Sequence, residues 1–355
     1  MDWKKYSLLG LGLLIIILLV WWAGLKDVIE ILKGARLEYF ALAILAYVAA
    51  VIMWALRWRV LLKSLGIDAP FRTIVAGLFV GVFINNVTPG ARGGGEPVRM
   101  YYISKHTKQP YGHVFATIMM DRIMDVIPVV VMLLLATIYV YNLGSFSLTL
   151  TLLLLDVFFA IITLATVGIL LSERKTKRIL YWFYRLFGKI TPKKAAKYEE
   201  KFVHAVEVSV PQFQENFKLL MRHKVAFTLS LIYSFAFWFL VLLRSYFIFI
   251  SINSPIKLLD VMVVQMIGIV VGMFMIIPGG AGIIEAINSA VYVLLGINKE
   301  IAVTATLLER LISYWAPTAI GGGIMTHFGI KVSQDKKKLE AEDDNDINDE
   351  PQQRV

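Results

Sequence analysis

The sequence contains no cysteine, five histidines and few charged residues for its length. Among its 355 residues, Asp, Glu, Lys and Arg together make up 17%, against about 25% in a typical soluble domain. The absence of cysteine excludes disulfides, thiolate nucleophiles and Cys-ligated metal sites. The histidines do not form an H-E-x-x-H pattern, so the sequence predicts no metal site and no cofactor.

Apolar residues, by contrast, make up 58% of the chain, where a soluble domain has about 45–50%. They gather in runs of about 18 residues or more, long enough to cross the ~30 Å hydrocarbon core of a bilayer. We therefore predict an all-α, polytopic membrane protein with about eight passes or hairpins. The net charge is +10. Because the basic residues flank apolar runs, membrane orientation and anionic headgroups explain this charge, and we expect no nucleic-acid partner.

The alternation of apolar and charged stretches divides the chain into six predicted segments. They are an N-terminal transmembrane anchor (1–36), a first membrane repeat (37–141), a connecting transmembrane helix (142–171), a basic cytoplasmic loop (172–223), a second membrane repeat (224–330) and a disordered acidic cytoplasmic tail (331–355). The first apolar run ends in Trp21 and Trp22 where a signal peptide would have small residues, so we expect it to be retained. The tail is rich in Asp and Glu and almost free of apolar residues, as disordered segments are.

The segment 172–223 carries twelve Lys and Arg against five Glu. Basic loops stay on the cytoplasmic side, which places this loop and both chain termini in the cytoplasm, with the spans in the cell membrane. Aromatic residues between the cations are typical of an amphipathic helix on a membrane surface. A solvated helical linker fits the same composition equally well.

A sparse motif of Pro, Gly and Glu occurs twice with the same spacing. Its first copy is Pro89, Gly90, Gly93 and Glu96, and its second copy is Pro278, Gly279, Gly282 and Glu285. Proline and glycine interrupt helices, and an interrupted helix inside a bilayer is tolerated only where it is buried in protein or lines a wet cavity. The sequence therefore predicts two pairs of broken or re-entrant helices.

The orientation of the loops predicts that the two copies are inverted relative to each other. Residues 71–110 would leave the cytoplasm and return to it, and residues 258–296 would enter from outside and return there. The inversion requires two arms in each case; if residues 71–87 crossed alone, it would disappear. Inverted-topology repeats with discontinuous helices are typical of secondary transporters, which bind substrate near the bilayer midplane.

An acid–Arg pair follows each copy inside an apolar stretch: Asp121-Arg122 and Glu309-Arg310. Each buried charge costs at least ~2.5–3.5 kcal/mol at bilayer depth. We therefore expect Glu96 and Glu285 to pair with Arg122 and Arg310, within or across the repeats.

Two interpretations of these charges stay open. Arg122 and Asp125 share one helical face, and Pro97 predicts a new helix whose first N–H groups, with Arg99 nearby, can hold a phosphate. In this case the charges line the path of a polar headgroup. Alternatively, they form a structural ion-pair lattice, while the glycines allow a tight turn and Glu96 caps the helix.

Other charged and aromatic residues carry weaker signals. Arg57, Trp58 and Arg59 end an apolar run and predict an interfacial anchor. Pro317 predicts a kink in the last span. Asp156 and Arg244 are isolated in apolar runs, and the sequence gives neither a partner.

Four motifs occur in an order that resembles a known family. They are NVTPGARGGGEPVR at 86–99, Asp121-Arg122 with Asp125, PGGAGIIE at 278–285, and Glu309-Arg310 with Trp315 and Pro317. Over most of residues 1–330 the chain resembles the flippase-like membrane family that includes the transmembrane part of lysylphosphatidylglycerol synthase. The resemblance implies re-entrant helices, a role in moving lipid headgroups, and a cavity lined by Glu96, Arg99, Arg122, Asp125, Glu285 and Arg310. The synthase members add a soluble aminoacyl-transferase domain, for which the acidic tail leaves no room, so we do not expect lysyl transfer.

We therefore expect a flippase that moves a phospholipid or a polyprenyl-linked glycolipid. It would hydrolyse no ATP, because a Walker A motif is absent, and it would not be an enzyme, because G-x-S-x-G and H-E-x-x-H are absent. Expected partners are anionic lipid headgroups, polyprenyl-phosphate lipids and an envelope-synthesis enzyme. One alternative is a membrane-embedded transferase that acts on a lipid-linked sugar or phosphate. Such enzymes hold Mg²⁺ with paired aspartates, and Asp121 and Asp125 are four residues apart, but Arg122 lies between them and the apolar runs hold no second cluster of this kind. Another is a non-transporting scaffold of a cell-envelope synthesis complex.

Overall fold

The computed structural model describes residues 3–88, 94–273 and 277–329, and in these ranges every regular element is a helix. Four of the described helices are long and apolar enough to cross a membrane: Leu37–Ser64, Tyr111–Asn142, Phe146–Leu170 and Lys224–Ser251. The predicted all-α, polytopic membrane class is confirmed. Pro89, Gly90 and Gly93 of the first motif, and the predicted tail 331–355, lie outside the described residues.

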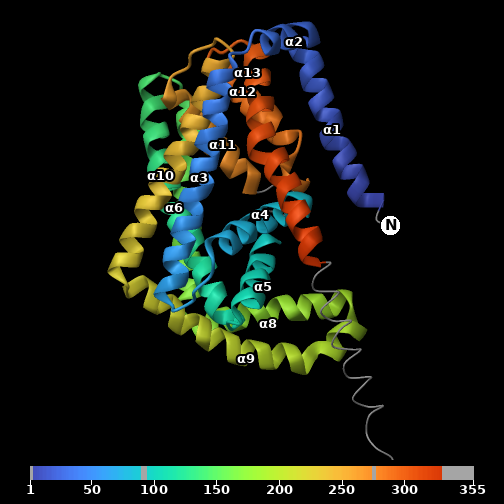
Figure 1. Ribbon diagram of the computed structural model, residues 1–355, viewed down its shortest axis with the longest axis vertical. Helices are drawn as coiled ribbons and strands as arrows, with labels where there is room; N and C mark the ends of the chain where they lie inside the picture. The colour runs from blue at the N-terminus through green and yellow to red at the C-terminus, as the bar shows by residue number, and fades with distance from the viewer. Residues whose placement is uncertain (1–2, 89–93, 274–276, 330–355) are drawn as a thin grey trace, which may run out of the picture.

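The helices follow the predicted apolar segments closely (Figure 1). In chain order they are α1 (Trp3–Ala23), α2 (Leu25–Lys33), α3 (Leu37–Ser64), α4 (Phe71–Val87), α5 (Gly95–Thr107), α6 (Tyr111–Asn142), α7 (Phe146–Leu170), α8 (Glu173–Ile190), α9 (Pro192–Arg222), α10 (Lys224–Ser251), α11 (Leu258–Met273), the 3₁₀ turn η1 (Pro278–Gly280), α12 (Ile283–Leu294) and α13 (Lys299–Arg310). A π-helical turn, η2 (Leu311–Trp315), continues α13, and the α-helix resumes over 316–329. Pro317 follows this π turn, an irregularity of the kind that bends helices.

Both interrupted regions form pairs of short helices. The first helix pair, α4 and α5, has 17 and 13 residues, and the second helix pair, α11 and α12, has 16 and 12. A full crossing needs about 20 residues, so these lengths suit re-entrant arms. Figure 1 shows the first pair toward the end of the molecule that carries α8 and α9, and the second pair toward the opposite end. The inverted topology, which concerns the two sides of a membrane, stays a prediction.

The centre of the molecule is built on α3 and α10, which lie side by side and form an extensive helix–helix contact. In its first half, the buried face of α3 consists of Ala43, Ala46 and Ala50. Small residues at this spacing let neighbouring helices approach closely. The long helix α6 packs against both α3 and α10, and this brings residues from three helices into one buried region.

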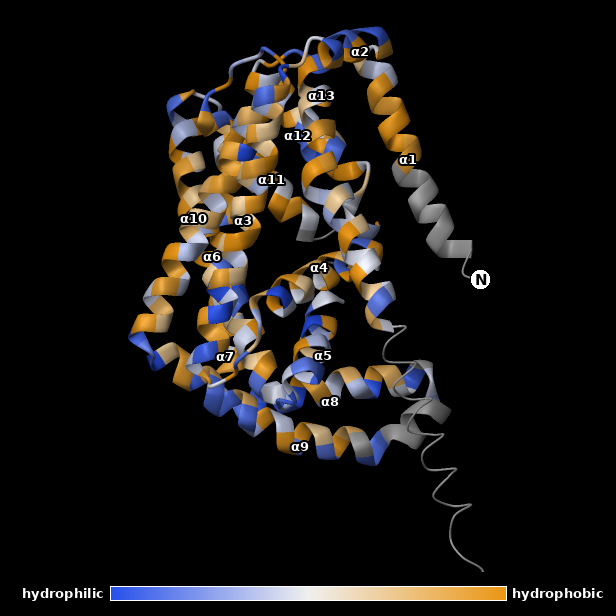
Figure 2. Ribbon diagram, viewed as in Figure 1, coloured by the Kyte–Doolittle hydropathy of each residue, from blue (hydrophilic) through white to orange (hydrophobic). Residues whose placement is uncertain are grey.

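The predicted basic loop is a helical hairpin of α8 and α9, which lies across one end of the long helices (Figures 1 and 2). The helix α9 packs closely against the start of α6 at Gly112. A Cβ at this position would come within 2.9 Å of the Ser209 carbonyl oxygen of α9. Within the hairpin, Lys177 Nζ lies 2.5 Å from Glu207 Oε2 and Tyr181 donates to Glu207 Oε1 at 3.0 Å. These two hydrogen bonds hold the pKa of the Glu207 carboxyl below its ordinary value.

Candidate functional site

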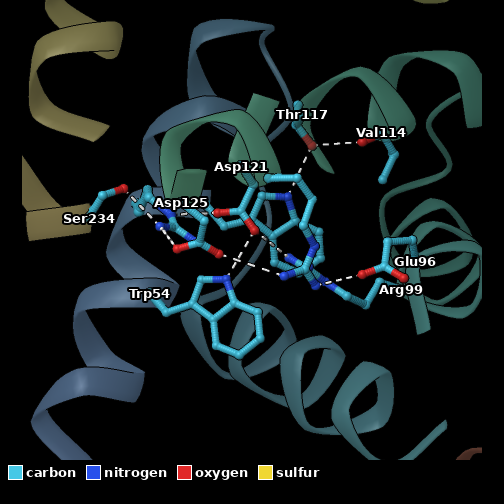
Figure 3. A network of polar contacts seen from close by, with 11 residues as sticks. Trp54, Glu96, Arg99, Val114, Thr117, Asp121, Asp125 and Ser234 are labelled. Carbon is cyan, nitrogen blue, oxygen red and sulfur yellow. Dashed lines mark hydrogen bonds and ion pairs between the residues drawn. The ribbon is translucent and has the colours of Figure 1, made fainter. Parts of the chain in front are cut away.

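A buried carboxylate, Asp121 of α6, receives three side-chain donors from two other helices (Figure 3). Its Oδ1 accepts from Arg57 Nε at 2.6 Å, and its Oδ2 accepts from Trp54 Nε1 at 3.0 Å and from Arg99 Nη2 at 3.2 Å. The side chains of Arg57 and Asp121 are 0% exposed. A buried pair of this kind needs further hydrogen bonds. Trp54 and Arg99 supply them to Asp121, whereas Nη2 of Arg57 has no hydrogen-bond partner among the described residues.

Arg57 also joins α3 to a second acid and to α10. Its Nη1 lies 2.6 Å from Asp125 Oδ1 and donates to Ser234 Oγ at 2.8 Å. Asp121 and Asp125 are one helical turn apart on α6, so one guanidinium reaches both. The predicted magnesium pair of the transferase alternative is thus engaged by an arginine, and the described residues contain no cluster of metal-ligating side chains.

The predicted interfacial anchor is wrong for Arg57 and Trp58. Both are 0% exposed, and Trp58 Nε1 donates to Thr117 Oγ1 at 3.0 Å. The helix α3 continues to Ser64, which places these residues inside the protein rather than at the helix end. The hydropathy pattern could not reveal this burial, because the partners of Arg57 lie on other helices.

Arg99 of α5 is buried between Asp121 and two indole rings. Its guanidinium carbon lies 4.1 Å from the ring centroid of Trp58 and 5.3 Å from that of Trp54, distances at which cation–π attraction stabilises the charge. Gly81 of α4 makes room for it, since a Cβ there would approach the Arg99 side chain to 2.6 Å. In the described structure, Nε and Nη1 of Arg99 have no hydrogen-bond partner.

Glu96 and Arg122 form the predicted pair of the first half. Arg122 Nη2 donates to Glu96 Oε1 at 2.6 Å, while its Nη1 lies 3.6 Å from Asp125 Oδ2. At the start of α5, the Gly95 N–H donates to the Asn85 side-chain oxygen at 2.7 Å. The expected pairing of Glu96 with Arg122 is confirmed.

Glu285 and Arg310 form the corresponding pair of the second half. Arg310 Nε donates to Glu285 Oε1 at 2.8 Å and Nη2 donates to the Gly279 carbonyl at 3.0 Å. The other oxygen of Glu285 accepts from the Gly282 N–H at 2.8 Å, which secures the start of α12. The guanidinium also lies 4.0 Å from the ring centroid of Tyr314. Arg310 therefore contacts the Gly279 main chain at the interruption, the first turn of α12 through Glu285, and the ring of Tyr314.

The remaining acid of the second half, Glu309, binds Arg244 of α10. Arg244 Nη2 and Gln265 Nε2 both donate to Glu309 Oε1 at 2.8 Å. No partner for Arg244 is predictable from the sequence. Asp156, the other isolated charge, accepts from Thr137 Oγ1 at 2.8 Å between α6 and α7.

The two halves thus repeat one arrangement of four charged residues. In the first, Arg57 binds Asp121, which is 64 residues further on, and Arg122 binds Glu96 across 26 residues. In the second, the corresponding bonds are Arg244 to Glu309 across 65 residues and Arg310 to Glu285 across 25 residues. The signal that sequence reasoning missed is an arginine inside an apolar run, at a matching distance before each acid–Arg pair.

The two clusters carry balanced charge. The first cluster is Arg57, Arg99, Arg122, Glu96, Asp121 and Asp125, and the second cluster is Arg244, Arg310, Glu285 and Glu309. Each contains as many arginines as carboxylates. Such neutrality lowers the cost of placing charge at membrane depth.

The clusters differ in exposure. Arg122 is 37% exposed and faces a groove of about 310 Å³ between α6 and α7, whose apolar walls include Ile123, Val126, Phe159 and Ile162. The side chains of Arg310 and Glu285 are only 7% and 1% exposed. Of the six predicted cavity residues, the structure therefore brings Glu96, Arg99, Arg122 and Asp125 together in one cluster and places Glu285 and Arg310 in the other.

Tyr314 lies where the two halves meet. Its hydroxyl is 3.4 Å from the Asn86 carbonyl oxygen at the end of α4 and 3.5 Å from the Pro278 carbonyl oxygen of η1. The Asn86 side chain donates to Thr318 Oγ1 at 2.7 Å. Gly279 allows this approach, with φ of 60° and a position where a Cβ would collide with the Tyr314 ring.

Comparison with known proteins agrees with this architecture. A family profile described as the lysylphosphatidylglycerol synthase TM region matches residues 9–321. The chain belongs to this family. The resemblance noted on the motifs is confirmed, and it covers the described helices from α1 to beyond α13.

The match to curated relatives, which are named as membrane proteins, covers nearly the whole length of each. A UPF0104 membrane protein of Pyrococcus horikoshii is 39% identical over 320 residues, which cover 90% of this chain and 96% of the relative. A UPF0104 membrane protein of Methanocaldococcus jannaschii is 29% identical over 347 residues, covering 94% and 97%. One from Methanothermobacter thermautotrophicus is 28% identical over 340 residues, covering 94% and 98%.

Proposed function

We propose that this protein binds phosphate-bearing lipid headgroups at Arg122 and moves them across the cell membrane without ATP hydrolysis. The observation that supports this most directly is the position of Arg122. Its half-buried guanidinium faces an apolar groove between α6 and α7, two helices of membrane-spanning length. A lipid tail fits the apolar walls, while its phosphate can reach the cation.

The chemistry of Arg122 suits a phosphate. A guanidinium presents planar, paired N–H donors that match phosphate oxygens, and such charge-assisted bonds are among the stronger ones in proteins. Among the described residues Arg122 donates to Glu96, and its contact with Asp125 at 3.6 Å is too long for a hydrogen bond. An arriving phosphate can therefore bind Arg122 by taking the place of Glu96.

The buried residues serve this exchange by staying fixed. Arg57 and Arg99 balance Asp121 behind Arg122, so this carboxylate stays paired while Arg122 changes partner. Arg310 and Glu285 have a different part, because they are closed in and hold the second helix pair. We assign headgroup contact to Arg122, Glu96 and Asp125, and bracing to Arg99, Glu285 and Arg310.

The proposal includes a substrate class and a membrane side. The substrate is a phospholipid or a polyprenyl-phosphate lipid, and the orientation has both termini in the cytoplasm, on the strength of the basic segment 172–223. The protein acts as a transporter rather than an enzyme, alone or beside an envelope-synthesis enzyme. Any coupling would come from an ion or from the lipid gradient, because the sequence has no Walker A motif.

The proposal is tested in proteoliposomes that contain the purified protein and either a fluorescent phospholipid or a fluorescent polyprenyl phosphate. We expect translocation above that of empty vesicles for at least one lipid, and an Arg122→Ala rate lower by about tenfold or more, since a hydrogen bond to a charged group contributes ~1.5–3 kcal/mol. Arg36→Ala is the matched control, because Arg36 is 44% exposed and its side chain contacts the nearby residues Glu38 and Tyr39.

Two results would contradict the proposal. One is wild-type translocation no faster than in empty vesicles across both lipid classes. The other is an Arg122→Ala rate equal to that of Arg36→Ala, which would remove the headgroup role of Arg122. Thermal unfolding of each variant in detergent separates loss of transport from loss of folding.

A further inference from the structure

The helix α8 starts where a membrane-length helix stops. The span α7 ends at Leu170 and α8 begins at Glu173, with Ser172 capping it by accepting from the Lys175 N–H at 3.4 Å. So short a connection keeps the start of α8 at the level of the membrane boundary. Figure 1 shows α8 running crosswise to α3, α6 and α10 at this end of the molecule.

One face of α8 is covered by α9. Lys177 and Tyr181 bind Glu207, and the Tyr184 ring stacks on Phe202 with 4.0 Å between centroids. Positions 177, 181 and 184 follow helical spacing, so they lie on one side of α8. The hairpin fixes how α8 is rotated about its own axis.

The opposite face of α8 is apolar and exposed. At ~100° per residue, Trp182, Phe183, Leu186 and Phe187 point away from Tyr181 and Tyr184. Trp182 and Phe183 are each 57% exposed, and Leu186 and Phe187 are also exposed. A stripe of four large, exposed apolar side chains with helical spacing is typical of a surface that binds a protein or a membrane.

A row of cations borders this stripe. Arg174, Arg178, Arg185 and Lys189 are exposed and are separated by four, seven and four residues, which places them along one edge of the helix. The only acid in α8 is Glu173, and it pairs with Lys177 at 2.9 Å on the α9 side. The exposed face is therefore apolar in the middle and positive along one edge.

We infer that α8 is an interfacial helix that binds the anionic headgroup layer of the membrane its own spans cross. The aromatic stripe lies at the boundary between headgroups and acyl chains, and the basic row contacts lipid phosphates. The connection to α7 favours a lipid surface over a soluble partner, because it holds the stripe at membrane level. This inference stands independently of lipid transport.

The absence of cysteine from the sequence makes the test direct, since single cysteines can be introduced into an otherwise unaltered chain. Spin labels at Phe183→Cys and Leu186→Cys probe the stripe, and His204→Cys on an exposed position of α9 is the control. The full-length protein is placed in phosphatidylcholine vesicles with or without phosphatidylglycerol. Collision rates with oxygen, which enters the bilayer, and with a water-soluble nickel chelate are then measured.

We expect labels at 183 and 186 to collide several-fold more with oxygen than with nickel, relative to the label at 204. The preference should be larger with phosphatidylglycerol. The substitutions Arg178→Gln and Arg185→Gln neutralise part of the basic edge. They should remove the difference in oxygen preference between the two vesicle types, while the oxygen preference in pure phosphatidylcholine vesicles stays unchanged.

Three outcomes would overturn the inference. Equal nickel access at 183, 186 and 204 would make α8–α9 a solvated hairpin. Shielding from both reagents, with dipolar broadening between labels, would mean that a second copy of the chain covers the stripe. Identical depths in both vesicle types, unchanged by the arginine substitutions, would exclude recognition of anionic lipid.

Discussion

At the scale of single residues, the guanidinium of Arg57 joins three helices. It bonds Asp121 and Asp125 of α6 and Ser234 of α10, all from a position on α3. The pair it forms with Asp121 is fully buried. Removing one partner of such a pair leaves an uncompensated buried charge, which is far more costly than losing an exposed pair.

We therefore expect Arg57→Gln to destabilise the protein by about 3–5 kcal/mol, the cost typical of breaking a buried ion pair. Arg36→Gln, which breaks the exposed pair with Glu38 at 3.3 Å, should change stability little. Thermal unfolding of both variants in detergent measures the difference. Equal melting temperatures would show that Arg57 does not hold the helices together.

The sequence predicted the pairs of Glu96 with Arg122 and of Glu285 with Arg310, because both occur at repeated spacing beside a recognisable motif. It did not predict the environment of Arg57 or Arg99. Their partner Asp121 is contributed by a third helix, and only packing in space decides that an arginine beside tryptophans is buried. The exposure of Arg122 likewise depends on how α7 lies against α6, and the sequence alone does not fix this.

At the scale of elements, the second helix pair depends on left-handed backbone at its interruption. Gly279, Gly280 and Gly282 have φ of 60°, 65° and 84°. Residues with a Cβ are strained in this region by roughly 1–2 kcal/mol. Gly279 is under a further constraint, because the Tyr314 ring occupies the space that a Cβ would need.

Gly279→Ala should therefore be more damaging than Gly296→Ala. Gly296 also has positive φ, at 89°, but no atom lies within 4 Å of an added Cβ. Backbone strain is shared by the two variants, so the difference between their unfolding temperatures in detergent isolates the contact with Tyr314. If both variants unfold at the same temperature, Tyr314 does not pack there.

Several elements were predictable because their signal is local. The arm α4 has the predicted bounds, 71–87, since an apolar run and the Pro-Gly motif define it. The hairpin of α8 and α9 was foreseen only as helical, because its geometry rests on contacts such as Tyr184 with Phe202 across 18 residues of chain. The π turn Leu311–Trp315 left no sequence signal beyond the nearby Pro317.

At the scale of the whole molecule, the two helix pairs approach the centre from opposite ends, and the two clusters of charge repeat one set of spacings (Figure 1). The sequence motif indicated a duplication of the interrupted helices. The structure extends the correspondence to the first long helix of each half, since Arg57 of α3 matches Arg244 of α10. Membrane sidedness was inferred from the distribution of basic residues alone.

An inverted topology predicts the accessibility of three exposed positions. A cysteine at Lys105 should react with an impermeant maleimide from one side of the membrane, and cysteines at Ser147 and Lys257 from the other. The measurement uses intact cells and inverted vesicles, and each single-cysteine variant starts from a chain with no other thiol. The two-armed first pair needs one further variant, a cysteine at exposed Asp68, which should be labelled from the same side as position 105 because two arms return the chain to its starting side. Labelling of positions 68 and 105 from opposite sides would rule out the two arms and with them the inversion.

The phenol of Tyr314 connects the two halves of the molecule through main-chain contacts. Its oxygen lies at nearly equal distances from the carbonyls of Asn86 and Pro278, one from each half. A hydroxyl has a single proton to donate, so the phenol can donate to only one of these two carbonyls at a time. The phenol therefore contacts main-chain oxygens beside both helix interruptions, and loss of its hydroxyl would affect both at once.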